Sequence, residues 1–189
     1  MSLVQPYSEE TCQQCSTLLH NGGVIAYPTE GVFGIGCNPL DENAVERIVN
    51  IKQRDAAKGL ILVAATRDQL EPYLQPFTPV EEQRVDSTWP GPVTWVVRSR
   101  ESVPDLLTGG RPTLAVRVSD HPVVNAICKA FDGAVISTSA NFSGQPPCTN
   151  AKETANHLGE LLDLIVDAPV GGLAGATEIR NIADGKRLR

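Results

Sequence analysis

The sequence predicts an α/β fold in which helices pack on an open, twisted sheet that mixes parallel and antiparallel strands. Short apolar runs typical of strands alternate with amphipathic segments typical of helices. Several predicted strands also follow one another without a helix between them, as in residues 93–97 and 114–118, which disfavours a purely parallel sheet. The 189 residues are 41% hydrophobic and contain no linker or repeat, so we expect a single domain over residues 1–189.

The first third of the chain predicts two helices, each followed by a strand. Ser8 is expected to cap the first helix, whose first turn carries two glutamates, and a Gly-Gly pair ends it. Residues 24–27 form a short apolar run that predicts a buried strand. Asp41 is expected to cap a second helix that ends near Lys52, and residues 60–64 predict the next strand.

The rest of the chain continues this alternation of helices and strands. Capping-box patterns at Thr66 and Thr78 predict two short helices before a rigid turn at residues 89–92. Asp120 is expected to cap a helix at residues 122–131. The remaining predicted elements are strands at residues 93–97, 114–118, 134–138 and 164–166, a helix from Asn150, and a hairpin at residues 179–182 that turns at Asp184-Gly185.

Composition excludes several classes of protein. The 16 Lys and Arg against 22 Asp and Glu give a net charge of −6, which opposes general polyanion binding but leaves room for a local basic pocket. No apolar run of about 18 residues and no secretion signal occur, so we expect a cytoplasmic protein without a membrane span. The five cysteines predict free thiols, and Cys12 with Cys15 lacks the further ligands of a zinc site, so we expect no metal-binding residues.

Two loops in the first third combine polar groups with glycine or with positive charge. Thr29 and Gly31 follow a strand and precede further glycines, which either lets the backbone approach a ligand or forms an ordinary turn. Lys52, Arg54 and Lys58 lie at or just beyond a helix end. They either bind phosphate or compensate the helix dipole, and their spacing leaves both interpretations open.

Two further segments place polar groups on or directly after strands. Thr113 and Arg117 share one face of a predicted strand, so Arg117 is either buried with an anionic partner or exposed at a sheet edge. Residues 137–141 hold three hydroxyls and an amide, which suit phosphate oxygens and ribose but are also common in turns. Phosphate-loop, serine-hydrolase and zinc-protease motifs are absent.

Five segments occur in order along nearly the whole chain: PTEGVFGIG, KQRDAAKGLILV, WPGPVTWVV, TLAVRVSDHP and STSANFSGQPP. Together they resemble the YrdC/TsaC family of threonylcarbamoyl-AMP synthases, in the short bacterial form. The resemblance implies an open mixed sheet with a concave ligand pocket. It implies that L-threonine, bicarbonate and ATP, with Mg²⁺, give threonylcarbamoyl-AMP and pyrophosphate. The product would pass to the tRNA threonylcarbamoyl transferase machinery and modify adenosine in tRNAs that read codons beginning with A.

The resemblance also implies roles for individual residues. Lys52 and Arg54 would be catalytic, because they would stabilise the transferring phosphate. The residues expected to contact ATP are Lys58, Thr113, Ser139, Asn141 and Arg189. The residues expected to contact threonine are Thr29, Gly31, Arg117, Ser137 and Thr177. Within that set, Arg117 would pair with the threonine carboxylate, which matches the planar guanidinium.

Gly31 departs from the family pattern, because many members have a threonine at this position. The missing side chain removes one contact to the substrate. Two other functions stay open at this stage. One is an RNA-binding factor in ribosomal RNA maturation, and weak RNA binding by the enzyme itself is also open. The other is a sugar-phosphate enzyme of related fold, for which the sequence shows no acidic metal cluster.

Overall fold

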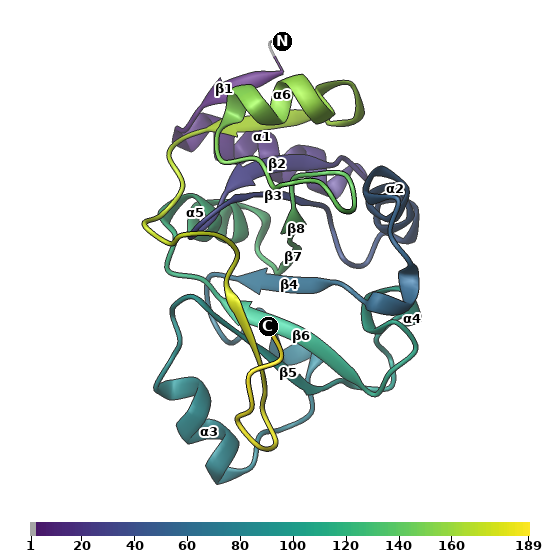
Figure 1. The fold of residues 1–189 in the computed structure, drawn as a ribbon, viewed down its shortest axis with the longest axis vertical. Helices are drawn as coiled ribbons and strands as arrows, with labels where there is room; N and C mark the ends of the chain where they lie inside the picture. The colour runs from purple at the N-terminus through teal and green to yellow at the C-terminus, as the bar shows by residue number, and fades with distance from the viewer. Residues whose placement is uncertain (1–2) are drawn as a thin grey trace.

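The strands form two five-stranded sheets in a computed structural model that describes residues 3–189. Figure 1 shows the first sheet in the upper half of the molecule and the second sheet below it. The first sheet runs in the order β1 (Val4–Pro6), β9 (Leu164–Asp167), β2 (Ile25–Pro28), β3 (Phe33–Gly36) and β8 (Thr138–Ser139). The second runs in the order β10 (Glu178–Asn181), β5 (Val93–Arg98), β6 (Thr113–Val118), β4 (Ile61–Ala64) and β7 (Val135–Ile136).

Both sheets mix parallel and antiparallel pairs, as the sequence predicts. In the first sheet, β9 is parallel to β1 and β2, whereas β3 is antiparallel to β2 and β8. In the second sheet, β10 and β5 are parallel, as are β6 and β4, and the other two pairs are antiparallel. The mixed α/β class is therefore confirmed. The sequence predicts one open sheet, whereas in the structure the predicted strands belong to two sheets.

The helices begin where local capping groups predict. Ser8, Asp41, Thr78 and Asn150 each accept a hydrogen bond from a backbone N–H of the following first turn. The α-helices are α1 (Glu9–His20), α2 (Glu42–Lys52), α3 (Pro79–Asp86), α4 (Asp105–Thr108), α5 (Pro122–Phe131) and α6 (Ala151–Leu158). Short 3-10 helices span η1 (Ala56–Lys58), η2 (Glu71–Tyr73) and η3 (Gly159–Leu161).

Two helix predictions are wrong in detail. No helix begins at Thr66, because the Gln69 side chain accepts from the Ala65 N–H and donates to the Cys128 carbonyl, which ties residues 65–70 into turns, and the short helix of this stretch, η2, begins only at Glu71. Asp120 does not cap α5. The His121 side chain accepts from the first turn instead. The structure also adds β1, β3 and α4, which the sequence did not separate from their loops.

Apolar contacts between the sheets and the helices form two buried clusters. One includes Phe33 of the first sheet with Leu62 and Val116 of the second. The other includes Tyr27 and Val63, again one from each sheet, together with residues of α1 and α5. Because each cluster draws on both sheets, burial of apolar surface holds the two sheets against each other.

The predicted strand at residues 134–138 crosses from one sheet to the other. Its first part, β7, pairs with β4 of the second sheet, and its last part, β8, pairs with β3 of the first. Gly36 allows this crossing, because a Cβ atom there would lie 2.1 Å from the Ile136 carbonyl oxygen. Ser137 stands between the two parts, and its N–H donates to the Ile61 carbonyl at 2.8 Å.

The cysteines and the helices of residues 3–189 show neither a metal site nor a membrane span. All five cysteines are buried and free. In this described range no cluster of three or more His, Cys, Asp or Glu side chains is placed to hold a metal ion. None of the helices there has the length and apolar character needed to cross a membrane.

Candidate functional site

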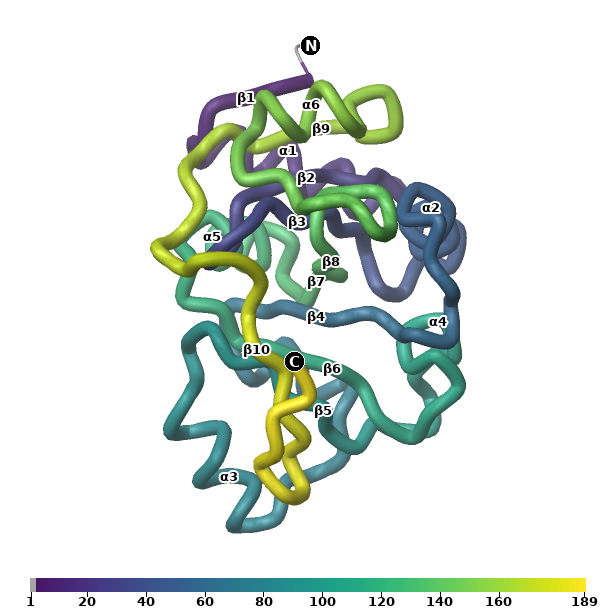
Figure 2. Tube along the Cα trace, viewed as in Figure 1, coloured from purple at the N-terminus to yellow at the C-terminus, as the bar shows by residue number. Residues whose placement is uncertain are grey.

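A cavity of about 450 Å³ opens beside the crossing segment. Residues from both sheets line it, together with Ser137, Thr138 and Ser139 of the crossing itself. The C-terminal segment supplies a further wall. It is drawn in yellow in Figures 1 and 2, where it runs down from the first sheet to the second. The predicted concave pocket therefore lies where four separate parts of the chain meet.

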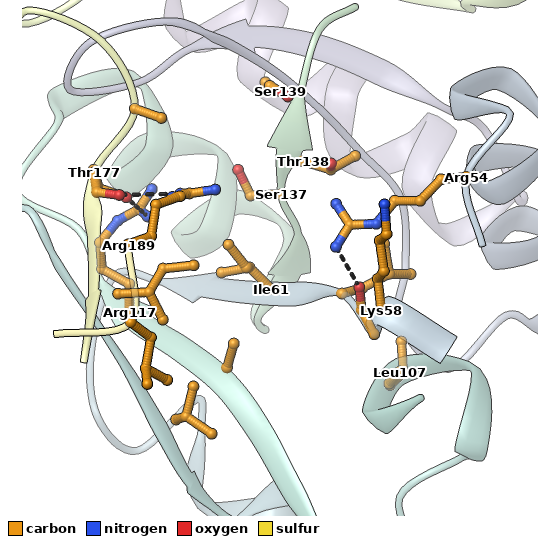
Figure 3. Close-up of a pocket in the computed structure, with 18 of the residues that line it drawn as sticks. Arg54, Lys58, Ile61, Leu107, Arg117, Ser137, Thr138, Ser139, Thr177 and Arg189 are labelled. Carbon is orange, nitrogen blue, oxygen red and sulfur yellow. Dashed lines mark hydrogen bonds between the residues drawn. The ribbon is translucent and has the colours of Figure 1, made fainter. Parts of the chain in front are cut away.

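The lining of this cavity is strongly cationic. Its charged side chains are Arg54, Lys58, Arg111, Arg117 and Arg189, and the lining residues include no Asp or Glu. Figure 3 shows Arg54 and Lys58 at one end of the cavity, Arg117 and Arg189 at the other, and Ser137 between them. A protein with a net charge of −6 thus contains one site that favours an anion.

Arg117 is buried rather than exposed at a sheet edge, with 3% of its surface accessible. Its Nη1 group donates to the hydroxyls of Thr94 and Thr177, at 3.1 and 3.0 Å. Its Nη2 group lies 3.1 Å from the Glu30 Oε2 atom. The predicted strand face is confirmed, because Thr113, Ala115 and Arg117 all line the cavity. The open-edge interpretation of Arg117 is wrong.

The Nε atom of Arg117 is buried and has no hydrogen-bond partner. A buried donor without a partner costs free energy, so it marks a place where a ligand acceptor is favoured. The Nε atom of Arg54 is in the same condition. The two unpartnered donors belong to the two ends of the cavity.

Arg54 and Arg189 carry charge into partly buried positions. Arg54 donates from Nη2 to the Gly59 carbonyl at 3.1 Å, and its pKa is lowered by burial and by the charge of Arg111. Arg189 donates from Nη2 to the Thr177 carbonyl at 3.0 Å. Burial is the main cause that lowers the pKa of Arg189, and the positive charges of Arg117 and Arg54 lower it further.

Lys52 lies behind the cavity and not on its wall. Its Nζ group donates to the carbonyl oxygens of Ser139 and Asn141 and to the Asn141 Oδ1 atom, and the Ser139 Oγ atom lies 3.3 Å away. These acceptors occupy all three donors of the ammonium group. Lys52 therefore fixes the turn at residues 139–141. Because its side chain is buried, the interpretation that it compensates the helix dipole at an exposed helix end is wrong.

The turn at residues 139–141 has one member on the cavity wall and one behind it. Ser139 lines the cavity and donates from Oγ to the Asn141 Oδ1 atom at 2.7 Å. The Asn141 Nδ2 group donates to the Gln145 carbonyl, so the amide faces the loop that follows. Asn141 supports the turn and does not line the cavity.

Gly31 lies under a glycine-rich strap, residues 170–176. The N–H groups of Gly171 and Leu173 donate to the carbonyls of Thr29 and Glu30, at 2.9 and 3.0 Å. A Cβ atom at Gly31 would lie 1.9 Å from the Gly175 carbonyl oxygen. The strap therefore occupies the space that a side chain at position 31 would need, and Gly31 does not line the cavity.

Most of the residues that the sequence analysis assigned to the site meet at this cavity. Its lining includes Thr29, Arg54, Lys58, Thr113, Arg117, Ser137, Ser139, Thr177 and Arg189. Lys52, Gly31 and Asn141 lie behind it. Sequence analysis missed Arg111, which lines the cavity, and also Thr94 and Ser119, which lie behind Arg117. The alternation of β5 places Thr94 on a definite face, but nothing local marks Arg111.

We expect the Lys52 ammonium to lose its proton near pH 8, well below the ordinary value of about 10.4. Burial is the main cause, and the charge of Arg54 adds to it. Lys52 is then charged below this pH and neutral above it, and its hold on residues 139–141 weakens as the pH rises. The ¹³Cε signal in lysine-labelled protein, assigned with Lys52→Met, measures this. A midpoint at the ordinary lysine value would contradict it.

Replacement of Gly31 by alanine should displace the strap, because the new Cβ atom would overlap the Gly175 carbonyl. We expect faster amide hydrogen exchange at Gly171 and Leu173, measured by NMR or mass spectrometry. Gly172→Ala is the matched control, because a Cβ atom at that position meets nothing within 4 Å. Equal exchange in the two variants would show that the strap does not depend on Gly31.

Comparison with known proteins identifies relatives over nearly the whole chain. A family model described as "Telomere recombination", named for Sua5, YciO and YrdC, matches residues 17–188. A threonylcarbamoyl-AMP synthase from Photobacterium profundum is 47% identical over 182 residues, which cover 95% of this chain and 98% of that protein. One from Serratia proteamaculans is 48% identical over 173 residues, which cover 90% of this chain and 91% of that protein.

Solved structures share the fold. P. abyssi Sua5 complexed with L-threonine is 30% identical, with a TM-score of 0.89 over 98% of this chain. The match covers 54% of that structure, so the chain spans about half of P. abyssi Sua5. E. coli YciO is 26% identical with a TM-score of 0.81, covering 98% of this chain and 91% of that one. Because the family model matches residues 17–188 and relatives of 47–48% identity cover at least 90% of the chain, this chain belongs to the Sua5/YciO/YrdC family.

Proposed function

We propose that this chain synthesises threonylcarbamoyl-AMP from L-threonine, bicarbonate and ATP and releases pyrophosphate. The observation that carries the proposal is the cationic cavity, whose five charged lining side chains suit a substrate with several negative charges. Relatives that cover almost the whole chain at 44–48% identity have the name of this synthase. The cavity volume of about 450 Å³ is also in the usual range for small-molecule sites.

The reaction needs positioning more than it needs a protein nucleophile. The amine of threonine takes up CO₂ from bicarbonate as a carbamate, with loss of water. A carbamate oxygen then attacks the α-phosphorus of ATP, and pyrophosphate leaves. The protein lowers the barrier by holding two anions together and by stabilising charge on the transferring phosphate, which makes the enzyme a nucleotidyltransferase.

We assign the Arg117 end of the cavity to threonine. The unpartnered Nε atom of Arg117 provides a donor for the amino-acid carboxylate. The hydroxyls of Thr29, Ser137 and Thr177 belong to residues of the same lining and provide partners for the threonine hydroxyl and amine. Gly31 would act through the backbone that the strap holds.

We assign the opposite end to the phosphates of ATP. Arg54, Lys58 and Arg111 would hold them, and Thr113 and Ser139 would contact the rest of the nucleotide. Lys52 and Asn141 would act by fixing the turn that carries Ser139. Arg189 lies at the Arg117 end of the cavity (Figure 3), so it would contact the part of the nucleotide that reaches the threonine carbamate.

Magnesium would enter this cavity as the complex with ATP. The lining supplies hydroxyls and cations but no Asp or Glu side chain, whose carboxylate is the ligand that Mg²⁺ prefers from proteins. The phosphates and water would therefore supply its ligands. Hand-off of the product to the tRNA threonylcarbamoyl transferase machinery belongs to the same proposal. A general RNA-binding factor is not favoured, because the cations line one cavity in a chain with a net charge of −6.

The direct test is pyrophosphate release from ATP, measured with threonine and bicarbonate omitted in turn. We expect release to require both, because the attacking carbamate forms only from the two together. The product, threonylcarbamoyl-AMP, is identified by mass spectrometry. Release at the same rate without threonine would contradict the assignment.

The phosphate end generates a prediction for arginine variants. Arg54→Ala should lower turnover by roughly 10²–10³, by analogy with removal of one preorganised donor to a transition-state charge. Arg54→Lys should stay impaired, because it keeps the charge and loses the two-pronged geometry. Arg111→Ala should raise the KM for ATP by about tenfold, the cost of one charged hydrogen bond.

Arg47→Ala is the matched control for these variants. Arg47 is a partly exposed arginine paired with Asp163 at 2.7 Å and is not part of the cavity lining. We expect wild-type kinetics for it. Near-wild-type turnover of Arg54→Ala at saturating ATP would remove Arg54 from the mechanism.

A further inference from the structure

A buried carboxylate lies behind the arginine that we assign to threonine. Glu30 is 5% exposed, and its Oε2 atom lies 3.1 Å from the Arg117 Nη2 atom. We infer that Glu30, held by Ser119, is the positioning residue that orients the Arg117 guanidinium for the amino-acid carboxylate. The inference rests on the proposed function for its substrate, although the contacts themselves belong to the free protein.

Ser119 fixes the Glu30 carboxylate with a hydrogen bond of known direction. The Ser119 hydroxyl donates to the Glu30 Oε1 atom at 2.6 Å. The Ser119 Oγ atom accepts from the His121 N–H at 3.1 Å. Its lone pair is therefore engaged, and its proton is available for the Glu30 carboxylate. Ser119 is fully buried, and it links Glu30 to the start of α5.

Three separate segments then hold the guanidinium group. Glu30 comes from the loop after β2, Thr94 from β5 and Thr177 from the segment before β10. Hydrogen bonds occupy Nη1, Nη2 forms an ion pair with the Glu30 Oε2 atom without a hydrogen bond, and Nε has no partner. A fixed guanidinium with one free edge recognises a planar carboxylate at low entropic cost, because no rotamer has to be selected on binding.

Charge provides a second reason for this carboxylate. Among the described residues, Glu30 is the one acidic side chain that forms an ion pair with a lining cation at the threonine end. Its negative charge neutralises Arg117, whereas Arg54, Lys58 and Arg111 at the other end form no ion pair with any residue in the range 3–189. The phosphates of ATP are therefore attracted to the Arg54 end, and the singly charged carboxylate can occupy the Arg117 end.

The experiment measures steady-state kinetics for variants of this pair. Ser119→Ala should raise the KM for threonine by about tenfold and leave the KM for ATP and the kcat within about twofold. Glu30→Gln should raise the KM for threonine by about 100-fold, a loss typical of a reacting group misplaced by about 1 Å. Glu30→Asp, which keeps the charge, should recover part of that loss.

Two matched controls separate positioning from loss of stability. Ser16→Ala removes another buried serine hydroxyl, which donates to the Ala130 carbonyl at 2.8 Å away from the cavity. Glu81→Gln removes another buried glutamate, which pairs with Arg98 at 3.0 Å. We expect both to be less stable than the wild type and to keep its KM for threonine. If either control raises that KM as much as Ser119→Ala does, the positioning role is wrong.

An NMR measurement on the protein without substrate tests the role of Ser119 and Glu30 independently of the proposed function. The ¹⁵Nε–¹H signal of Arg117, assigned with Arg117→Lys, should shift in Ser119→Ala and stay unchanged in Ser16→Ala. If threonine-dependent pyrophosphate release is absent from the wild type, the proposed function fails, and this signal still decides whether Ser119 and Glu30 orient Arg117. An unchanged signal together with an unchanged KM for threonine in Ser119→Ala would overturn the inference, even if Glu30→Gln does not fold.

Discussion

The passage of one extended segment from the second sheet into the first is the constraint on which the cavity depends. Residues 135–139 pair with β4 and then with β3, and the sheets cannot separate or close at this point without breaking one of these ladders. Ser137 stands at the corner, where its N–H bonds the Ile61 carbonyl of β4 and its side chain lines the cavity. The corner also delivers Ser139 to the wall, where Lys52 holds the following turn from behind.

The charged side chains of the cavity wall are contacted by buried polar groups that do not reach the cavity. Cations form the wall, whereas Glu30, which pairs with Arg117, and Ser119, which holds Glu30, are not part of the lining. An isolated cation in such a position would be costly, and a cation neutralised on every side would attract no ligand. Because Glu30 pairs with Arg117 alone among the lining cations, the two ends of the cavity differ in their electrostatic potential.

Features set by neighbours in sequence were predictable. Ser8, Asp41 and Thr78 cap their helices because capping needs only the next few residues, and the alternation of residues 113–117 follows from strand geometry. Features set by distant partners were not. The buried position of the Lys52 side chain depends on the carbonyl oxygens of residues 139 and 141. The division of the predicted strand at residues 134–138 depends on its pairing with β4 at one end and with β3 at the other. The assignment of residues to a site came from the resemblance, and the structure added Arg111, Glu30 and Ser119.

The C-terminal wall has a consequence for the order in which the molecule is completed during translation. Thr177 bonds Arg117, Arg189 bonds the Thr177 carbonyl, and β10 joins the second sheet at its edge by pairing with β5. Both sheets contain strands made early, but these last contacts form only once residue 189 has emerged from the ribosome. Arg117 on β6 is therefore synthesised well before Thr177 and Arg189, so the Arg117 end of the cavity acquires its partners late in translation.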